Sequence, residues 1–289
     1  MSDGDIAFSS SNKPYDFGLL KKDVPYVNDD KKEHLLDILY PKEDKDNGIL
    51  LFNVHGGGYV YGYKEDSFIY ASIFANKGFT VISMNYHLMD AKKDLSIKDQ
   101  IQDVLKSVIF IVENKEKLKL NYSKICLMGD SAGGHIAMMV ALALRNHFLR
   151  KYYGIETNSN IEISSMVLSS PMYDFCHLKR LASLAINKEG VMTLFSKFYK
   201  NNALLRANSP KTYLSEGFVL PPILLIYSKK DIFKFQSIKQ KNEFKRLDRK
   251  LEIYYEPSKK CGHIFHHFNM NSSTTINANN AIENFLLNN

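Results

Sequence analysis

The fold of this chain is decided by the stretch Ile125-Cys126-Leu127-Met128-Gly129-Asp130-Ser131-Ala132-Gly133-Gly134-His135-Ile136-Ala137. The run before Ser131 is apolar, and a second apolar run, residues 137–140, follows it. This order predicts a strand, a sharp turn with Ser131 at its apex, and a helix. Gly129 and Gly133 flank the turn, because so tight a turn has no room for bulky neighbours and leaves the serine hydroxyl exposed above the sheet.

Strand and helix patterns alternate along the rest of the chain. Predicted strands lie at 17–27, 34–41, 49–54, 79–86, 163–169, 223–227 and 251–255, and predicted helices lie at 66–77, 97–112, 235–247 and 274–287. The helix at 235–247 is amphipathic and carries Phe235, Ile238, Phe244 and Leu247. Strands separated by helices predict βαβ units and a mostly parallel sheet flanked by helices. A chain of 289 residues with this pattern is expected to form a single α/β domain over residues 1–289.

One segment interrupts the alternation. Between about residues 173 and 220 the sequence has the apolar faces of short helices, at 178–185 and 191–199, and no strand. Pro221-Pro222 then closes the segment and the next strand begins. An all-helical insertion between sheet strands predicts a small cap over the strand ends, and we place it at about 173–220.

The composition is ordinary for a soluble globular enzyme, and the cysteine count fits a reducing compartment. No apolar run approaches the roughly 18 residues that a membrane span needs, and the polar start lacks a signal-peptide core, so we expect a cytoplasmic protein. The three cysteines are too few and scattered for a disulfide framework. The net charge of +7 comes from lysines mixed with acidic residues, which argues against a nucleic-acid partner. Assembly into a homo-oligomer stays open.

Three polar residues follow predicted strands in the order Ser131, Asp231 and His263. A serine hydroxyl is a weak nucleophile, so it needs a base to take its proton, and that base needs an orienting carboxylate. The carboxyl ends of strands in an open α/β sheet gather at one edge. We therefore predict Ser131 as nucleophile, His263 as base and Asp231 as its partner.

Other residues compete for two of these roles. Asp174 is an alternative carboxylate, although its place at the start of the cap favours a helix or turn cap. His266 and His267 share a segment with His263 and are alternative bases. The three histidines and Cys261 could also be taken as a metal cluster, but no carboxylate or second cysteine pair completes it, and we expect no metal.

A glycine-rich loop follows the predicted strand 49–54 and reads His55-Gly56-Gly57-Gly58. Consecutive glycines are kept where backbone N–H groups must point at a ligand. Acyl transfer needs preorganised donors for the developing oxyanion. The backbone N–H groups of Gly57, Gly58 and Ala132 are our candidates, and we expect the His55 side chain to brace the loop.

The glycine loop and the run Gly129-Asp130-Ser131-Ala132-Gly133-Gly134 together resemble the hormone-sensitive-lipase-like group of α/β-hydrolase esterases, over about residues 32–287. The resemblance implies the α/β-hydrolase fold and ester hydrolysis through an acyl-enzyme, with no cofactor. It also implies the roles given above for Ser131, Asp231, His263 and the three N–H donors. The sequence departs from the group at residues 87–91, where His87 begins a stretch that usually starts with Arg-Leu-Ala-Pro-Glu.

We therefore expect a serine carboxylesterase acting on small, short-acyl esters. Two alternatives remain open at this point. An amidase-type hydrolase such as an arylformamidase uses the same machinery on a C–N bond, and a non-catalytic binding protein can be built on the same fold.

Overall fold

The computed structural model describes residues 13–90, 94–177 and 201–289. Its strands are β1 (Leu20–Pro25), β2 (Leu35–Leu39), β3 (Ile49–Val54), β4 (Thr80–Met84), β5 (Lys124–Asp130), β6 (Ser165–Ser169), β7 (Ile223–Ser228) and β8 (Leu251–Glu256). Its α-helices are α2 (Phe68–Asn76), α3 (Ile97–Glu113), α4 (Ser131–Leu144), α5 (His147–Tyr152), α9 (Asn202–Ala207), α10 (Pro210–Ser215), α11 (Lys234–Arg246) and α12 (Ser273–Asn288). Short 3-10 helices are η1 (Lys32–His34), η2 (Glu43–Lys45) and η3 (Phe265–His267).

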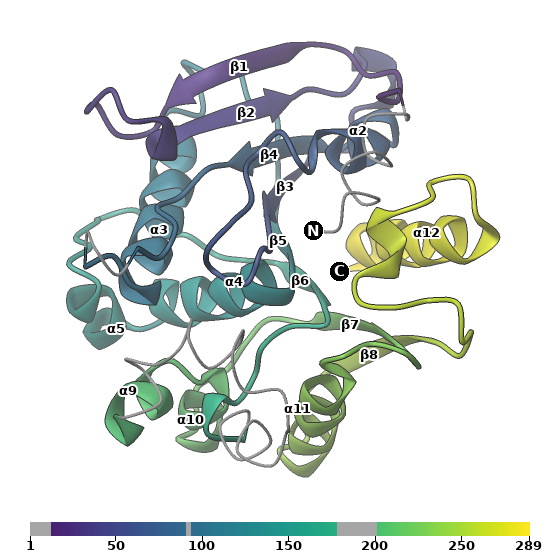
Figure 1. The fold of residues 1–289 in the computed structure, drawn as a ribbon. Helices are drawn as coiled ribbons and strands as arrows, with labels where there is room; N and C mark the ends of the chain where they lie inside the picture. The colour runs from purple at the N-terminus through teal and green to yellow at the C-terminus, as the bar shows by residue number, and fades with distance from the viewer. Residues whose placement is uncertain (1–12, 91–93, 178–200) are drawn as a thin grey trace.

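The eight strands form one sheet in the order β1-β2-β4-β3-β5-β6-β7-β8 (Figure 1). Strands β3 to β8 run parallel, whereas β2 is antiparallel to β4 and β1 is antiparallel to β2. Every residue of β3, β4, β6 and β7 is buried, as expected for parallel strands covered on both faces. The predicted mostly parallel sheet is confirmed, and β5 delivers Ser131 at its carboxyl end.

Helices cover both faces of the sheet (Figure 1). Because side chains alternate along a strand, β3 supplies both layers of the core. Leu50 and Phe52 belong to a cluster with side chains of α3 and α4. Leu51 belongs to a second cluster with side chains of α2 and α12. The α/β fold is therefore a three-layer structure, and on one face of the sheet α4 packs against both the strands and α3.

The buried face of α11 differs from the sequence expectation. We expected Phe235, Ile238 and Phe244 on that face, but Ile238 is 42% exposed. Gln236 and Gln240 are buried instead. The Gln236 side-chain amide forms two hydrogen bonds with the backbone after β6. It accepts from the N–H of Asp174 at 2.8 Å and donates to the carbonyl oxygen of Asp174 at 3.0 Å. Hydrophobicity alone misplaced the face because this helix packs against irregular backbone that needs hydrogen bonds.

The predicted cap lies partly outside the described residues, which exclude 178–200 and with them the two apolar faces that predicted its first helices. Within 173–177 and 201–220 the structure has α9 and α10 and no strand. The single-domain boundary and the cap boundary stay predictions. Helix α5, which the sequence did not suggest, precedes the loop at 153–160.

A buried lysine ties the β1–β2 hairpin to the segment after the glycine loop. The Lys64 side chain is 1% exposed, and its Nζ lies 2.8 Å from Asp23, 2.9 Å from Asp37 and 2.6 Å from Glu65. Burial lowers the pKa of Lys64, but hydrogen bonds to the three carboxylates outweigh burial and raise it. The ammonium group therefore stays charged, and it fixes the antiparallel edge of the sheet to the loop that carries the glycines.

Candidate active site

Ser131 occupies a strained turn between β5 and α4. Its φ angle is 50°, a left-handed conformation that serine rarely adopts. The close approach of two glycines makes room for the turn, because a Cβ on Gly129 would lie 2.6 Å from the carbonyl carbon of Gly133. A Cβ on Gly133 would lie 2.1 Å from the carbonyl oxygen of Val54 on β3. The predicted strand, turn and helix around Ser131 are confirmed.

Asp231 and His263 meet after the ends of β7 and β8. His263 Nδ1 lies 3.0 Å from Asp231 Oδ1, and the Asp231 side chain has no exposed surface. The backbone N–H of Phe233 donates to the same oxygen at 2.7 Å. The Ser170 hydroxyl donates to the other oxygen, Oδ2. A carboxylate held in this way fixes the imidazole with Nδ1 as the donor, so Nε2 keeps the lone pair of a base.

The loop that carries His263 is anchored to β7. The hydroxyl of Ser228, the last residue of β7, donates to the carbonyl oxygens of Cys261 and Gly262, both at 2.8 Å. The Phe233 ring meets the imidazole of His263 edge to face, with centroids 5.3 Å apart. His263 is therefore held from both sides, while its side chain keeps 22% of its surface exposed.

Asp130 connects the turn to the glycine loop. Its Oδ1 accepts a buried hydrogen bond from the backbone N–H of Gly56 at 3.0 Å. Burial raises the pKa of the Asp130 carboxyl to about 6, while the charge of His263 acts in the opposite direction. His263 is thus within electrostatic reach of the residue that precedes Ser131.

The raised pKa of Asp130 predicts a pH-dependent stability. The folded state holds the Asp130 proton more tightly than the unfolded chain does. This difference adds to the free energy of unfolding below about pH 4, and it is lost as the pH rises to about 6. Asp130→Asn keeps the acceptor oxygen without the charge. We therefore expect its free energy of unfolding to rise by roughly 3 kcal/mol relative to that of wild type as the pH goes from about 4 to about 6. Urea unfolding of both proteins from pH 4 to pH 8 measures the difference.

The exposed Asp44 supplies the control for this experiment. Asp44→Asn is expected to keep a nearly constant difference from wild type over the same range, since surface charges contribute little. A constant difference for Asp130→Asn as well would contradict the assignment of a shifted carboxyl at the turn.

The glycine loop has the backbone conformation that only glycine adopts freely. Gly57 and Gly58 have φ angles of 114° and 57°. His55 braces this loop, as expected, because its Nδ1 lies 2.8 Å from the Gly56 carbonyl oxygen and its ring stacks on Tyr86 at 4.2 Å. Burial lowers the pKa of His55 to about 4, which keeps its ring neutral. The loop is thereby fixed beside the turn at Ser131.

The alternative histidines lie in a buried network. His266 Nδ1 is 3.0 Å from the Tyr70 hydroxyl and its Nε2 is 2.8 Å from Ser169 Oγ, so both ring nitrogens are engaged. Burial lowers the pKa of His266 to about 3. His267 stacks on Tyr70 with centroids 3.8 Å apart, and burial holds its pKa well below the usual range of histidine. Neither ring pairs with Asp231 in the structure.

Asp174 has the capping role that its position suggested. Its Oδ1 accepts the backbone N–H of His177 at 2.9 Å, and its Oδ2 lies 3.0 Å from Lys239 Nζ. Sequence reasoning missed Ser170, which supports Asp231. Its place at the carboxyl end of β6, next to the strand that carries Ser131, was the available signal.

Comparison with solved structures identifies the class of fold. Esterase B from Lactobacillus Rhamnosis superposes with a TM-score of 0.85 at 21% identity, over 99% of this chain and 91% of that chain. An arylesterase structure superposes with a TM-score of 0.70 at 17% identity, over 99% and 90%. These likenesses show that the chain has the α/β-hydrolase fold.

The chain belongs to the BD-FAE family, whose profile matches residues 36–246. Esterase LipQ of Mycobacterium tuberculosis is 24% identical over 214 residues, covering 72% of this chain and 48% of that protein. Kynurenine formamidase of Danio rerio is 26% identical over 194 residues, covering 67% and 56%. This chain therefore spans about half the length of these curated relatives. The described residues contain no helix long and apolar enough to cross a membrane.

Proposed function

We propose that this protein hydrolyses small, short-acyl carboxylic esters through an acyl-enzyme. The observation that carries the proposal is the 3.0 Å contact between His263 and a fully buried Asp231, in a chain whose Ser131 sits at a strained strand-to-helix turn. His263 Nε2 takes the proton of Ser131 as its oxygen attacks the ester carbonyl. The imidazolium then gives that proton to the leaving alkoxide, and Asp231 stabilises the charge that forms in between.

Charge on the attacked carbonyl oxygen is stabilised by backbone donors. We assign this role to the N–H groups of Gly57, Gly58 and Ala132. Two features support it: the glycine loop is held to the turn through Asp130, and Ala132 lies in the first turn of α4, where the helix dipole favours an anion. Each such donor lowers the barrier by about 3–4 kcal/mol. Water then attacks the acyl-enzyme with His263 as base, and the acid is released.

The length of the predicted cap supports a substrate class, and the free cysteines support a cellular compartment. The cap predicted at about 173–220 is short in sequence, so we place the preference at short acyl chains. Names of relatives that include esterase and methylesterase support an ester substrate. All three cysteines are free, with Cys126 and Cys261 buried, which supports a reducing, cytoplasmic location.

A formamidase is the second candidate, because one relative is named kynurenine formamidase. Initial rates on p-nitrophenyl acetate, butyrate and octanoate, compared with an N-formyl arylamine, distinguish the two. We expect acetate and butyrate to be hydrolysed fastest, and octanoate to have a kcat/KM at least about tenfold lower, the effect of roughly 1.4 kcal/mol in the transition state. Turnover of the formamide alone would replace the esterase with the formamidase. Turnover of neither, with no labelling by a fluorophosphonate, would favour a binding protein.

A further inference from the structure

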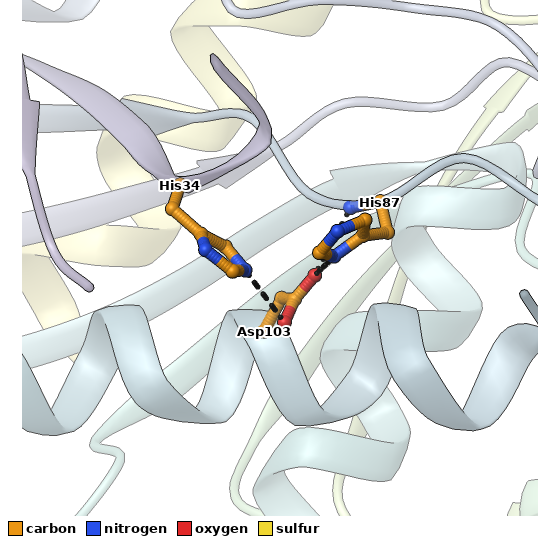
Figure 2. A group of neighbouring side chains, drawn as sticks. All are labelled: His34, His87 and Asp103. Atoms are coloured by element: carbon orange, nitrogen blue, oxygen red, sulfur yellow. Dashed lines mark hydrogen bonds and ion pairs between the residues drawn. The ribbon is translucent and has the colours of Figure 1, made fainter. Parts of the chain in front are cut away.

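Two histidines and one aspartate from distant parts of the chain meet beside α3, and Figure 2 shows their side chains pointing toward one another. His34 ends η1, His87 follows β4, and Asp103 lies within α3. Asp103 Oδ1 is 3.2 Å from His34 Nε2, and its Oδ2 is 2.6 Å from His87 Nδ1. One potential ligand atom from each residue lies within 4.8 Å of the other two. The three ligand atoms are therefore close enough together to surround one ion after small side-chain movements.

The two ring nitrogens of His34 each face a carboxylate, and a neutral ring cannot donate a hydrogen bond to both. The His34 side chain is 4% exposed and faces a carboxylate on each side, Asp29 at Nδ1 with distances of 2.8 Å and Asp103 at Nε2. A neutral imidazole carries one N–H, so it can donate to only one of them. When Nδ1 donates to Asp29, the lone pair of Nε2 points at Asp103. Either a proton or a metal ion between Nε2 and the carboxylate then relieves their repulsion.

The same arrangement is typical of metal-bound histidines. Such a ring usually donates its second N–H to a carboxylate, which fixes the tautomer and raises the basicity of the ligating nitrogen. Asp29 occupies this outer position toward His34. For bonds of about 2.0–2.1 Å at tetrahedral angles, ligand atoms lie roughly 3.3 Å apart. The 3.2 Å between His34 and Asp103 fits this spacing, and the 2.6 Å at His87 needs only a small outward movement of one side chain.

The charges around the cluster attract a cation. The His34 ring lies between two carboxylates, with Asp29 Oδ2 at 2.8 Å and Asp103 Oδ1 at 3.2 Å. Two ammonium groups also reach the carboxylates, Lys106 at 3.6 Å from Asp103 and Lys31 at 3.4 Å from Asp29. Both lysine side chains are partly exposed and can turn toward water. The imidazoles of His34 and His87 are more buried and stay beside Asp103.

We propose that His34, His87 and Asp103 bind one divalent transition-metal ion, with Zn²⁺ as the best fit. Two imidazole nitrogens and one carboxylate are a ligand set that suits Zn²⁺ rather than Ca²⁺ or Mg²⁺, which take oxygen ligands. The His87 side chain is 15% exposed, so water has access to the fourth position. This site does not depend on the proposed esterase activity.

The bound ion joins three elements and supports the glycine loop indirectly. His87 begins the segment whose Met89 N–H donates to the Tyr59 carbonyl oxygen at 2.8 Å. Gln100, one turn before Asp103 on α3, donates to the same oxygen at 2.8 Å. Tyr59 directly follows the three glycines. We therefore assign the ion a structural role, in which it holds the segment after β4 and α3 together beneath this loop.

Calorimetric titration of the chelator-treated full chain with Zn²⁺ tests the proposal. We expect one Zn²⁺ per chain, and at least a 100-fold loss of affinity in His34→Gln and in His87→Gln, since each removes a ligand but keeps an amide donor for Asp103. The exposed His147 supplies the matched control, and His147→Gln is expected to bind as wild type does. A hundredfold excess of Zn²⁺ over its Kd should raise the Tm by about 5 °C in wild type and not in the two cluster variants.

Two further measurements keep the test decisive if a variant folds poorly. Co²⁺ bound by wild type should give the visible ligand-field absorption of a tetrahedral site with nitrogen and oxygen ligands. Anomalous diffraction at the zinc edge from wild-type crystals should place the ion between the three side chains. An ion located elsewhere, equal affinity in the cluster variants, or no binding by wild type overturns the proposal.

Discussion

Replacing Ser131 with alanine is expected to lower kcat/KM for p-nitrophenyl acetate by about 10⁴- to 10⁶-fold. The alanine keeps the strained turn, whose φ of 50° costs about as much for either residue, but it has no oxygen to form the acyl-enzyme. His263 and the backbone donors remain in place, so the residual rate is that of water attack on a bound ester. Initial rates and fluorophosphonate labelling measure the loss.

The control for this prediction is a serine at the opposite end of β5. Ser123 is exposed and directly precedes β5, which ends next to Ser131. Ser123→Ala is expected to retain wild-type kcat/KM and labelling. Ser131→Ala should also keep the wild-type Tm within a few degrees. A Ser131→Ala protein that still hydrolyses the ester or takes the label would remove Ser131 from its proposed role.

The sequence predicts this fold well because its strongest signals are local. The continuous apolar run at residues 49–54, for example, became a buried parallel strand. The strained turn at Ser131 could be predicted because its geometry demands small residues at Gly129 and Gly133, and glycine is visible in the sequence. The position of Asp231 relative to His263 followed from the rule that strand ends gather at one edge of an α/β sheet. The sequence left Asp174, His266 and His267 as alternatives, and in the structure the contact is between Asp231 and His263.

Other features depend on contacts that no local pattern records. The cluster of His34, His87 and Asp103 joins residues up to 69 positions apart, and each of them alone is an ordinary polar residue. His87 attracted notice only as a departure from the family's usual stretch. The buried glutamines of α11 were missed for the same reason, because Gln236 is buried by the backbone groups it satisfies rather than by its own hydrophobicity.

Gly133→Ala is expected to destabilise the protein by about 3 kcal/mol or more, at the upper end of the usual cost of overpacking. A Cβ at this position would lie 2.1 Å from the carbonyl oxygen of Val54 and 2.4 Å from that of His55. Both contacts are backbone atoms at the end of β3, so no side-chain rotation relieves them. Alanine gains only about 1 kcal/mol over glycine in helix propensity, which is less than the clash.

Thermal and urea unfolding of Gly133→Ala measure this difference, and Gly262→Ala is the matched control. A Cβ on Gly262 meets no atom within 4 Å, so its alanine variant should stay within about 0.5 kcal/mol of wild type. Because the clash separates α4 from β3, the same substitution should also move Ser131 away from the glycine loop and lower kcat. Wild-type stability for Gly133→Ala would mean that α4 does not pack against β3 as closely as the turn requires.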